Sequence, residues 1–237
     1  MDKYELVERY EALGEDADFA EAKRLFEHDL TDQSTALDRR QYGYLLECNG
    51  RYMIGRAVEH YERAMALDPN AEKVQYQWMS AKVALFQQDD VIARYRERVA
   101  RSPGDLRELR LLSTAWLLAR DFRAASEVID AGLEAKPGDC KLLYDRGEVK
   151  AATGDPDGAL ADWRQALELC PDDLSPAYAS TFLHERHGRL AEAAESWRHI
   201  LEYAEAHGWE LTAAWPRREL LRLRDELANR HDPPGEG

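Results

Sequence analysis

Four prolines recur at a constant interval, and this interval constrains the fold of the chain more than any other feature. Pro69, Pro103, Pro137 and Pro171 are each separated by 34 residues, and each closes a similar phrase, such as Ala-Lys-Pro-Gly-Asp around Pro137. Because proline cannot continue a helix, each of these residues marks the end of a helical unit. The regular spacing indicates a chain built from one small unit that recurs and stacks on its neighbours.

A second pattern lies between the prolines and predicts two helices in each unit. Apolar residues recur at steps of three and four, which places one apolar stripe along each helix. In the unit that starts at Cys140, small residues stand at Gly147 and Ala159 and a large one at Trp163. Small side chains let two antiparallel helices approach closely, and large side chains fill the space beside them.

Aspartates mark where helices are expected to begin. Asp105, Asp139 and Asp173 each follow a repeat-closing proline by two residues. Aspartate is a favoured N-cap, because its carboxylate accepts a hydrogen bond from a free N–H of the first turn. Asp155 followed by Pro156 likewise predicts an N-cap and the first residue of a second helix.

This combination of large, small and proline residues resembles the tetratricopeptide repeat. The resemblance implies an all-α fold, a right-handed α-solenoid of about six helix-turn-helix repeats with a C-terminal capping helix. The turn expected between Gly50 and Ala57 is about two residues longer than the family turn. The expected limits are a degenerate first repeat at 1–35, further repeats at 36–71, 72–105, 106–139, 140–173 and 174–208, a capping helix at 209–230 and a disordered tail at 231–237.

The charge balance limits the classes of partner. The chain of 237 residues has a formal net charge of −14. A nucleic-acid-binding surface must be cationic to displace counterions from phosphates, so we expect no nucleic-acid partner. Anionic lipid headgroups disfavour an acidic surface, and no stretch reaches the ~18 apolar residues of a membrane span, so we expect no membrane partner. The N-terminus lacks a basic segment followed by an apolar run, so no signal peptide is predicted.

Cysteine and histidine spacing predicts neither a metal site nor a cofactor. Cys48, Cys140 and Cys170 form no metal-ligand motif, and His184 and His187 are one residue short of the spacing that two zinc-binding histidines share on a helix. Few and scattered cysteines favour a cytoplasmic location. Cys140 and Cys170 fall at the same end of one predicted hairpin, where we expect reduced thiols rather than a disulfide. Abundant Leu, Ala and Arg favour a bacterial source with a GC-rich genome.

The resemblance also implies a concave inner wall, formed mainly by the first helix of each repeat. Aromatic residues and arginines on such a wall are usual anchors of protein interfaces, although several of them could instead pack between helices. The positions that face the groove in the family are here Arg40, Tyr44, Glu47, Gln77, Trp78, Arg107, Arg110, Thr114, Tyr144, Glu148, Tyr178 and Phe182.

Arginines gather in the middle of the chain. Residues 94–123 hold eight arginines against four acidic residues, in a chain that is acidic overall. The planar fork of arginine suits carboxylates, so one interpretation is a site for an acidic segment of a partner. The alternative is a solvated helix face with ion pairs inside the chain. The partner is therefore expected to offer an acidic segment or one that binds aromatic side chains.

These features favour a protein-protein interaction adaptor or scaffold that holds a peptide or helix of another protein in its groove. Chaperone-binding members of the family grip a C-terminal carboxylate with a clamp of Lys, Asn and Arg. The Asn position here holds Tyr44, Ala81, Thr114 and Glu148 in successive units, so that function is not expected. Two alternatives stay open: a regulatory peptide-sensing module, and a noncanonical enzyme that uses Tyr144 and Glu148. The sequence leaves the partner's identity, the pathway and the oligomeric state open.

Overall fold

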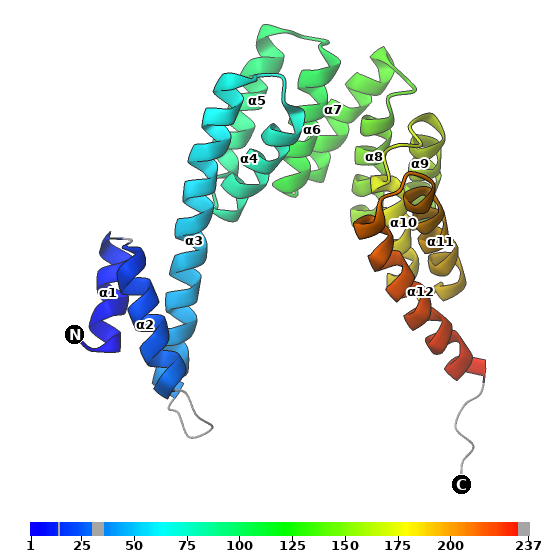
Figure 1. Cartoon of the computed structure of the whole chain (residues 1–237). Coiled ribbons are helices and arrows are strands. Elements are labelled where there is room, and N and C mark those ends of the chain that lie inside the picture. The colour runs from blue at the N-terminus through cyan, green and yellow to red at the C-terminus, as the bar shows by residue number, and fades with distance from the viewer. Residues whose placement is uncertain (14, 30–35, 232–237) are drawn as a thin grey trace. The chain divides into compact units, whose positions relative to one another are not determined.

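Helices form every regular element of the described chain, which confirms the predicted all-α class. The computed structural model describes residues 1–13, 15–29 and 36–231 (Figure 1). The helices are α1 (Lys3–Leu13), α2 (Asp16–Asp29), α3 (Ala36–Leu67), α4 (Glu72–Ala84), α5 (Gln88–Arg101), α6 (Leu106–Leu118), α7 (Phe122–Ala135), α8 (Cys140–Thr153), α9 (Pro156–Leu169), α10 (Ser175–Arg186), α11 (Leu190–Ala206) and α12 (Glu210–His231). The tail expected to be disordered lies outside the described residues, apart from His231.

The chain divides into two units, residues 1–91 and 92–237. In the first unit, α1 and α2 pack against α3, and α4 packs beside α3 (Figure 1). In the second unit, α6 packs on α7, α8 on α9 and α10 on α11, and α7 and α9 also pack on the helices that follow them. Each hairpin therefore contacts the next one along the chain, which is the packing of a helical-repeat protein. None of the described helices combines the length and apolarity that crossing a lipid bilayer requires.

The repeat signals in the sequence fall where helices end and begin. The four periodic prolines lie just after α3, α5, α7 and α9. Asp105, Asp139 and Asp155 are N-caps whose carboxylates accept from backbone N–H groups of the first turn. Asp173 differs from the expectation: α10 is capped by Leu174, and the Asp173 carboxylate accepts from the Ser175 N–H at the start of the helix.

Close contact between small and large side chains holds each hairpin together. A Cβ at Gly147 on α8 would overlap the indole of Trp163 on α9, so only glycine fits this crossing. The Trp163 Nε1–H donates to the Tyr144 carbonyl oxygen at 3.1 Å, which ties the indole to the backbone that Gly147 exposes. Gly132 on α7 has the same role between hairpins, since a Cβ there would overlap Leu142 of α8.

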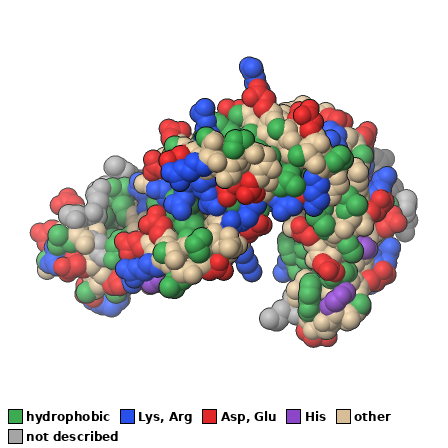
Figure 2. Space-filling model, turned by 90° about the horizontal axis from the view of Figure 1, so that it is seen from above, with side chains coloured by type: hydrophobic (Ala, Val, Ile, Leu, Met, Phe, Trp, Pro, Cys, Tyr) green, Lys and Arg blue, Asp and Glu red, His purple; other side chains and the backbone are tan. Residues whose placement is uncertain are grey.

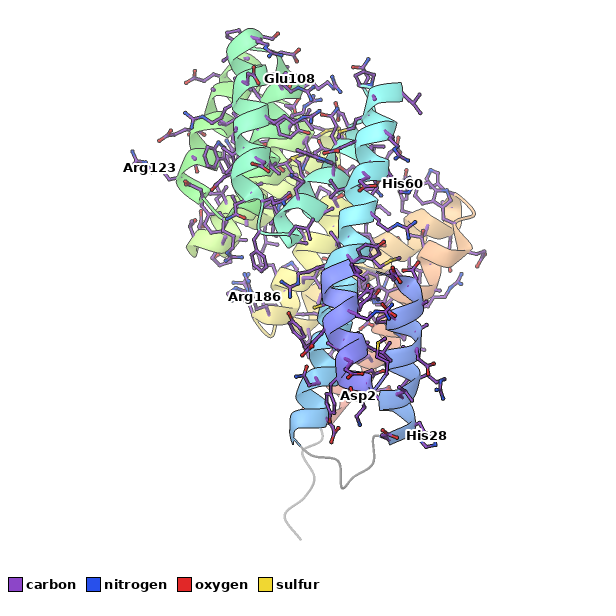
Figure 3. The ribbon with its side chains drawn as sticks, turned by 90° about the vertical axis from the view of Figure 1, so that its left-hand side faces the viewer. Asp2, His28, His60, Glu108, Arg123 and Arg186 are labelled. Carbon is purple, nitrogen blue, oxygen red and sulfur yellow. A yellow bond between two sulfur atoms is a disulfide. The ribbon has the colours of Figure 1, made fainter. Side chains whose placement is uncertain are left out.

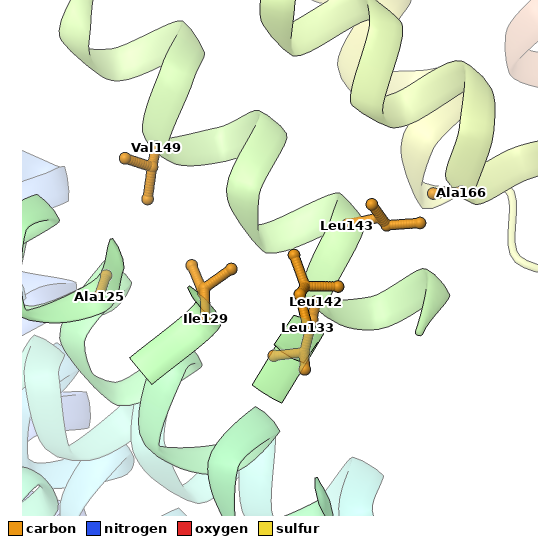
Figure 4. Close-up of a cluster of buried hydrophobic side chains, with 7 residues drawn as sticks. All are labelled: Ala125, Ile129, Leu133, Leu142, Leu143, Val149 and Ala166. Carbon is orange, nitrogen blue, oxygen red and sulfur yellow. The ribbon is translucent and has the colours of Figure 1, made fainter. Parts of the chain in front are cut away.

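Apolar side chains from three helices form a continuous core in the second unit. Figure 4 shows this cluster, to which α7, α8 and α9 all contribute. Leu142 and Leu143 lie next to each other on α8, but they face α7 and α9 respectively, so one helix belongs to the core of two hairpins. The cluster consists of Ala125, Ile129, Leu133, Leu142, Leu143, Val149 and Ala166.

One prediction for the first unit is wrong. The sequence indicated a hairpin with a turn between Gly50 and Ala57, but α3 is one uninterrupted helix of 32 residues from Ala36 to Leu67. Glycine often ends a helix by adopting a left-handed backbone conformation. Gly50 and Gly55 do not adopt it, so the helix continues through both. The six residues between Gly50 and Ala57 include no proline, and Tyr, Met and Ile there tolerate helical geometry.

The last helix packs as the sequence predicted. Leu223 of α12 is fully buried, and Leu220 and Leu227 pack partly buried against the same cluster, which includes Trp197 and Ile200 of α11. Pro216 lies inside α12 rather than at its first residue. The Arg222 guanidinium donates to Glu185 of α10 at 2.6 Å and so adds an ion pair between α12 and the preceding repeat.

The expectation of reduced thiols is also wrong. Cys140 begins α8 and Cys170 follows the end of α9, and the two residues form a disulfide with a Cα–Cα distance of 6.2 Å. Antiparallel helices bring the start of one next to the end of the other, and the distance lies within the range that a disulfide spans. The expectation came from the assumed compartment, whereas the hairpin geometry decides whether the two residues can bond.

Replacing Gly147 by alanine should destabilise the second unit. The added methyl group must displace the Trp163 indole, and overpacking of this kind costs about 1–3 kcal/mol of unfolding free energy. Chemical denaturation followed by circular dichroism measures the change. Gly138→Ala is the control, because a Cβ there lies 3.8 Å from Leu169 and fits without movement. Equal stability of the two variants would contradict the packing argument.

Reducing the disulfide should lower the free energy of unfolding by about 2–4 kcal/mol, because the bond constrains a long loop of the unfolded chain. The sequence separation of the two cysteines is 30 residues. Thermal melts with and without a thiol reductant measure the effect. The variant with both Cys140→Ala and Cys170→Ala should melt at the same temperature with and without reductant. An oxidised wild-type protein that does not respond to reductant would refute this prediction.

Candidate functional site

Four of the predicted groove residues come together in one hollow of the second unit. Tyr144 and Glu148 stand one turn apart on α8, and Tyr178 and Phe182 stand one turn apart on α10, the first helices of two successive hairpins. The hollow has a volume of about 520 Å³. It is lined by Tyr144, Glu148, Ala151, Trp163, Ser175, Tyr178, Ala179, Phe182, Leu183 and Arg186. We call it the α8–α10 groove.

The groove places a carboxylate in a poorly hydrated position. Burial among the aromatic side chains, together with the nearby negative charge of Asp145, raises the pKa of Glu148 above its ordinary value. Burial and the charge of Glu148 also raise the pKa of the Tyr144 hydroxyl. Three groups partly offset this effect and lower the pKa of Glu148: the positive charge of Lys141, a hydrogen bond with Tyr144, and the positive charge of Arg186 at the C-terminal end of α10 (Figure 3). The groove therefore carries one acidic and one basic group among aromatic rings.

Helix α12 supplies a further ring to the aromatic wall. Trp215 stacks on Tyr178 with ring centroids 5.7 Å apart and an interplanar angle of 19°, and its centroid is 5.9 Å from that of Phe182. Trp197 of α11 completes the cluster, 5.0 Å from Trp215. Phe182 keeps 49% of its surface exposed and Trp215 keeps 40%. The cluster is therefore held in place on one side and open to solvent on the other.

The predicted residues of the first unit do not belong to this groove. Trp78 is buried, with 3% of its surface exposed, and its Nε1–H donates to Glu62 of α3 at 3.1 Å. Gln77 lines a separate hollow between α3 and α4. Tyr44 packs against the apolar cluster of α1, α2 and α3. The side chains of Arg40 and Glu47 lie outside the described residues.

The predicted arginines of the second unit make ion pairs within the chain. Arg110 binds the buried carboxylate of Asp139 through two parallel hydrogen bonds, one of them 2.9 Å from Nε to Oδ1. Burial acts to raise the pKa of Asp139, but Arg110, the Leu142 N–H and Lys136 outweigh it and lower the pKa. Acidic and basic side chains are interspersed on the face shown in Figure 2.

Two further pairs follow the same pattern. Arg98 of α5 donates to Glu108 of α6 at 2.7 Å, and Arg107 lies 3.9 Å from the same carboxylate. The Thr114 hydroxyl donates to the Arg110 carbonyl oxygen at 3.0 Å, within its own helix. These contacts favour the interpretation of the central arginines as a solvated face with internal ion pairs.

Some groove residues were missed in the sequence, and for different reasons. Ser175 and Arg186 occupy the same helical face as Tyr178 and Phe182, so the spacing that selected those two would also have found them. Trp163 was assigned to packing alone, although one side of its indole borders the groove. Trp215 had no signal, because its position follows from how α12 lies on the last hairpin.

Comparisons with known proteins agree with this geometry. The sequence profile described as "Tetratricopeptide repeat" matches residues 140–173, which are α8, α9 and the turn after them. A search of curated proteins found no significant match. The solved structure of TTC0263, a thermophilic tetratricopeptide-repeat protein of Thermus thermophilus, aligns with a TM-score of 0.51 and 24% identity over 75% of this chain and 92% of that one.

Two further solved structures align over more of the chain with lower scores. YrrB, described as a tetratricopeptide-repeat protein with an unusual peptide-binding site, gives 15% identity over 92% of this chain and all of its own, with a TM-score of 0.46. A tetratricopeptide-repeat protein of Parabacteroides merdae ATCC 43184 gives 14% identity over 93% of each chain, also with a TM-score of 0.46.

The fold and the groove define a helical-repeat protein with an open aromatic hollow between successive hairpins. Residues 140–173 match the tetratricopeptide repeat, and the fold of the chain is similar to that of a solved tetratricopeptide-repeat protein. Proteins of this class generally mediate interactions between proteins.

Glu148→Gln should raise the thermal stability at neutral pH. The folded carboxyl binds its proton more tightly than the unfolded one, so its ionised form destabilises the fold, and this cost disappears as the pH falls through the raised pKa. The advantage of the variant should therefore shrink as the pH approaches about 4. Melting curves across this range measure it, with the exposed Glu168→Gln of α9 as control. A variant that is less stable than the wild type at neutral pH would contradict the argument.

Proposed function

We propose that the protein is an adaptor or scaffold that binds a segment of a partner protein in the α8–α10 groove. The observation that carries the proposal is the aromatic wall beside the Glu148 carboxylate, in which Phe182 is exposed and Tyr144 and Tyr178 are partly buried. Rigid aromatic side chains that remain accessible contribute large contact area at low entropic cost, as at the hot spots of protein interfaces. The class of the protein supports the same conclusion.

The partner segment should present an apolar or aromatic side chain to the wall. Glu148 and Arg186 would then select its polar neighbours, since each can bond a group of opposite charge or a backbone amide. The acidic segment expected from the central arginines finds less support, because Arg110 and Arg98 already bind Asp139 and Glu108. Selectivity is therefore proposed to come from the groove and not from the arginine-rich region.

A binding role accounts for the properties of Glu148 better than a catalytic one. A raised carboxyl pKa also suits a general acid, which was the basis for the enzyme alternative. Burial among aromatic side chains is the main reason why the pKa of Glu148 is raised. A binding groove needs such side chains, so a binding role explains the raised pKa without a catalytic one. We therefore propose that Glu148 orients a bound segment.

Peptides selected from a random library displayed on phage provide the test. Phe182→Ala should weaken the binding of selected peptides at least about tenfold, because truncating an aromatic anchor typically costs about 2 kcal/mol or more. Isothermal titration calorimetry on synthetic copies measures the loss. Leu169→Ala is a matched control, since Leu169 and Phe182 are each 49% exposed but Leu169 lies outside the groove. Peptides that bind both variants as tightly as the wild type would refute the proposal.

The oxidation state of Cys140 and Cys170 in cells reports the compartment of the protein. We propose the cytoplasm, as the sparse cysteines suggest, where the Cys140–Cys170 disulfide of the structure would be open to reduction by cellular thiols. Rapid thiol alkylation in intact cells followed by mass spectrometry decides the matter. Alkylated Cys140 and Cys170 would support a cytoplasmic location, and a pair protected as the disulfide would place the protein in an oxidising compartment.

A further inference from the structure

Helix α3 carries an apolar stripe that the chain leaves partly uncovered. Its members recur at steps of three and four, so they share one face of the helix. Leu46 is 44% exposed and Met53 is 51% exposed, whereas Ala57 and Tyr61 are half-buried. The stripe runs through both halves of α3, past the position where the sequence predicted a turn.

The C-terminal half of this stripe borders an open groove. Ile54, Ala57 and Tyr61 of α3 face Tyr76 and Ala81 of α4 across a hollow of about 390 Å³. In the hairpin that the sequence predicted, the helix at 36–49 would pack here, as α8 packs on α9. In the structure residues 36–49 continue along the axis of α3 instead. The groove therefore lacks the helix that the repeat pattern of the sequence predicts there.

Two glycines in the middle of α3 lie where the described part of the chain leaves room for a side chain. A Cβ at Gly50 or Gly55 would meet nothing within 4 Å, in contrast to Gly147 and Gly132. Glycine is unfavourable inside a helix, so a position that keeps it without a contact calls for another cause. Glycine lets the backbones of two crossing helices approach closely, and Gly50, four residues after Leu46, lies on the same face of α3 as the apolar stripe.

We propose that two copies of the chain pair through α3, with the helices side by side in opposite directions. Residues 36–49 of each copy then fill the α3–α4 groove of the other, and Gly50 lies where the two helices cross. Such an interface is self-complementary, as a twofold dimer requires, and it exchanges a segment that a closed hairpin would keep.

The continuous helix favours a second copy over the chain's own segment. With 32 residues, α3 is about 48 Å long, and its two halves point away from each other along one axis. Leu45 of the N-terminal half is buried against α1 and α2, which holds this half in place while the neighbouring Leu46 stays exposed. The exposed half-stripe of one copy and the open groove of another therefore match without any change in either chain.

Sedimentation equilibrium on the full chain tests the pairing. The wild type should show a mass twice the 27.2 kDa of one chain at micromolar concentrations. Ala57→Arg places a charged side chain in the groove and should give the mass of a single chain. Ala66→Arg is the matched control, because it makes the same change on the exposed opposite face of α3 and should leave the dimer intact.

Leu46→Arg gives a second, independent reading. Leu46 is exposed in the single chain, so this variant should fold normally, as circular dichroism would show, and should still lose the dimer. A wild type that remains a single chain at all concentrations would overturn the proposal. This includes a chain whose residues 36–49 fold back into its own α3–α4 groove. A dimer that survives both Ala57→Arg and Leu46→Arg would overturn it as well. The groove of α8 and α10 plays no part, so peptide binding should persist in every variant.

Discussion

The close approach of two antiparallel helices at a glycine is the contact on which this fold depends. At Gly147 the backbone of α8 lies against the Trp163 indole, and the indole in turn bonds the Tyr144 carbonyl. The next hairpin can then pack on a hairpin closed in this way through Leu142 and Leu143, and the same arrangement can be repeated along the chain.

The groove follows from this packing. Because α8 packs against α10, Tyr144 and Glu148 of the first helix and Tyr178 and Phe182 of the second line the same hollow. Buried carboxylates keep the wall in position: Arg146 holds Asp162 of the same hairpin at 2.9 and 2.6 Å, and Arg110 holds Asp139 of the next. Many of the ion pairs in the described chain join helices, whereas Glu148 and Arg186 are the charged residues among those that line the groove.

The two units use one pattern with different results. In the second unit the small residues are enclosed by large ones, and the hairpins close. In the first unit a Cβ at Gly50 or Gly55 would meet nothing within 4 Å, α3 is one continuous helix, and Leu46 and Met53 of its apolar stripe are exposed. The same features that build a closed repeat within one chain can therefore build an interface between two chains when the turn is replaced by helix.

The sequence by itself determined the helical class, the ends of most helices and the wall formed by Tyr144, Glu148, Tyr178 and Phe182. These depend on spacing within a single helix and on residues with strong local effects, such as Pro137 and Asp139. Only the tertiary structure decided that Arg110 is committed to Asp139, that Trp215 joins the aromatic wall, that Cys140 and Cys170 bond, and that α3 has no turn. The physical reason is that the first three depend on how separate helices pack against one another. The fourth depends on whether packing in a hairpin lowers the free energy more than the backbone hydrogen bonds of a continuous helix.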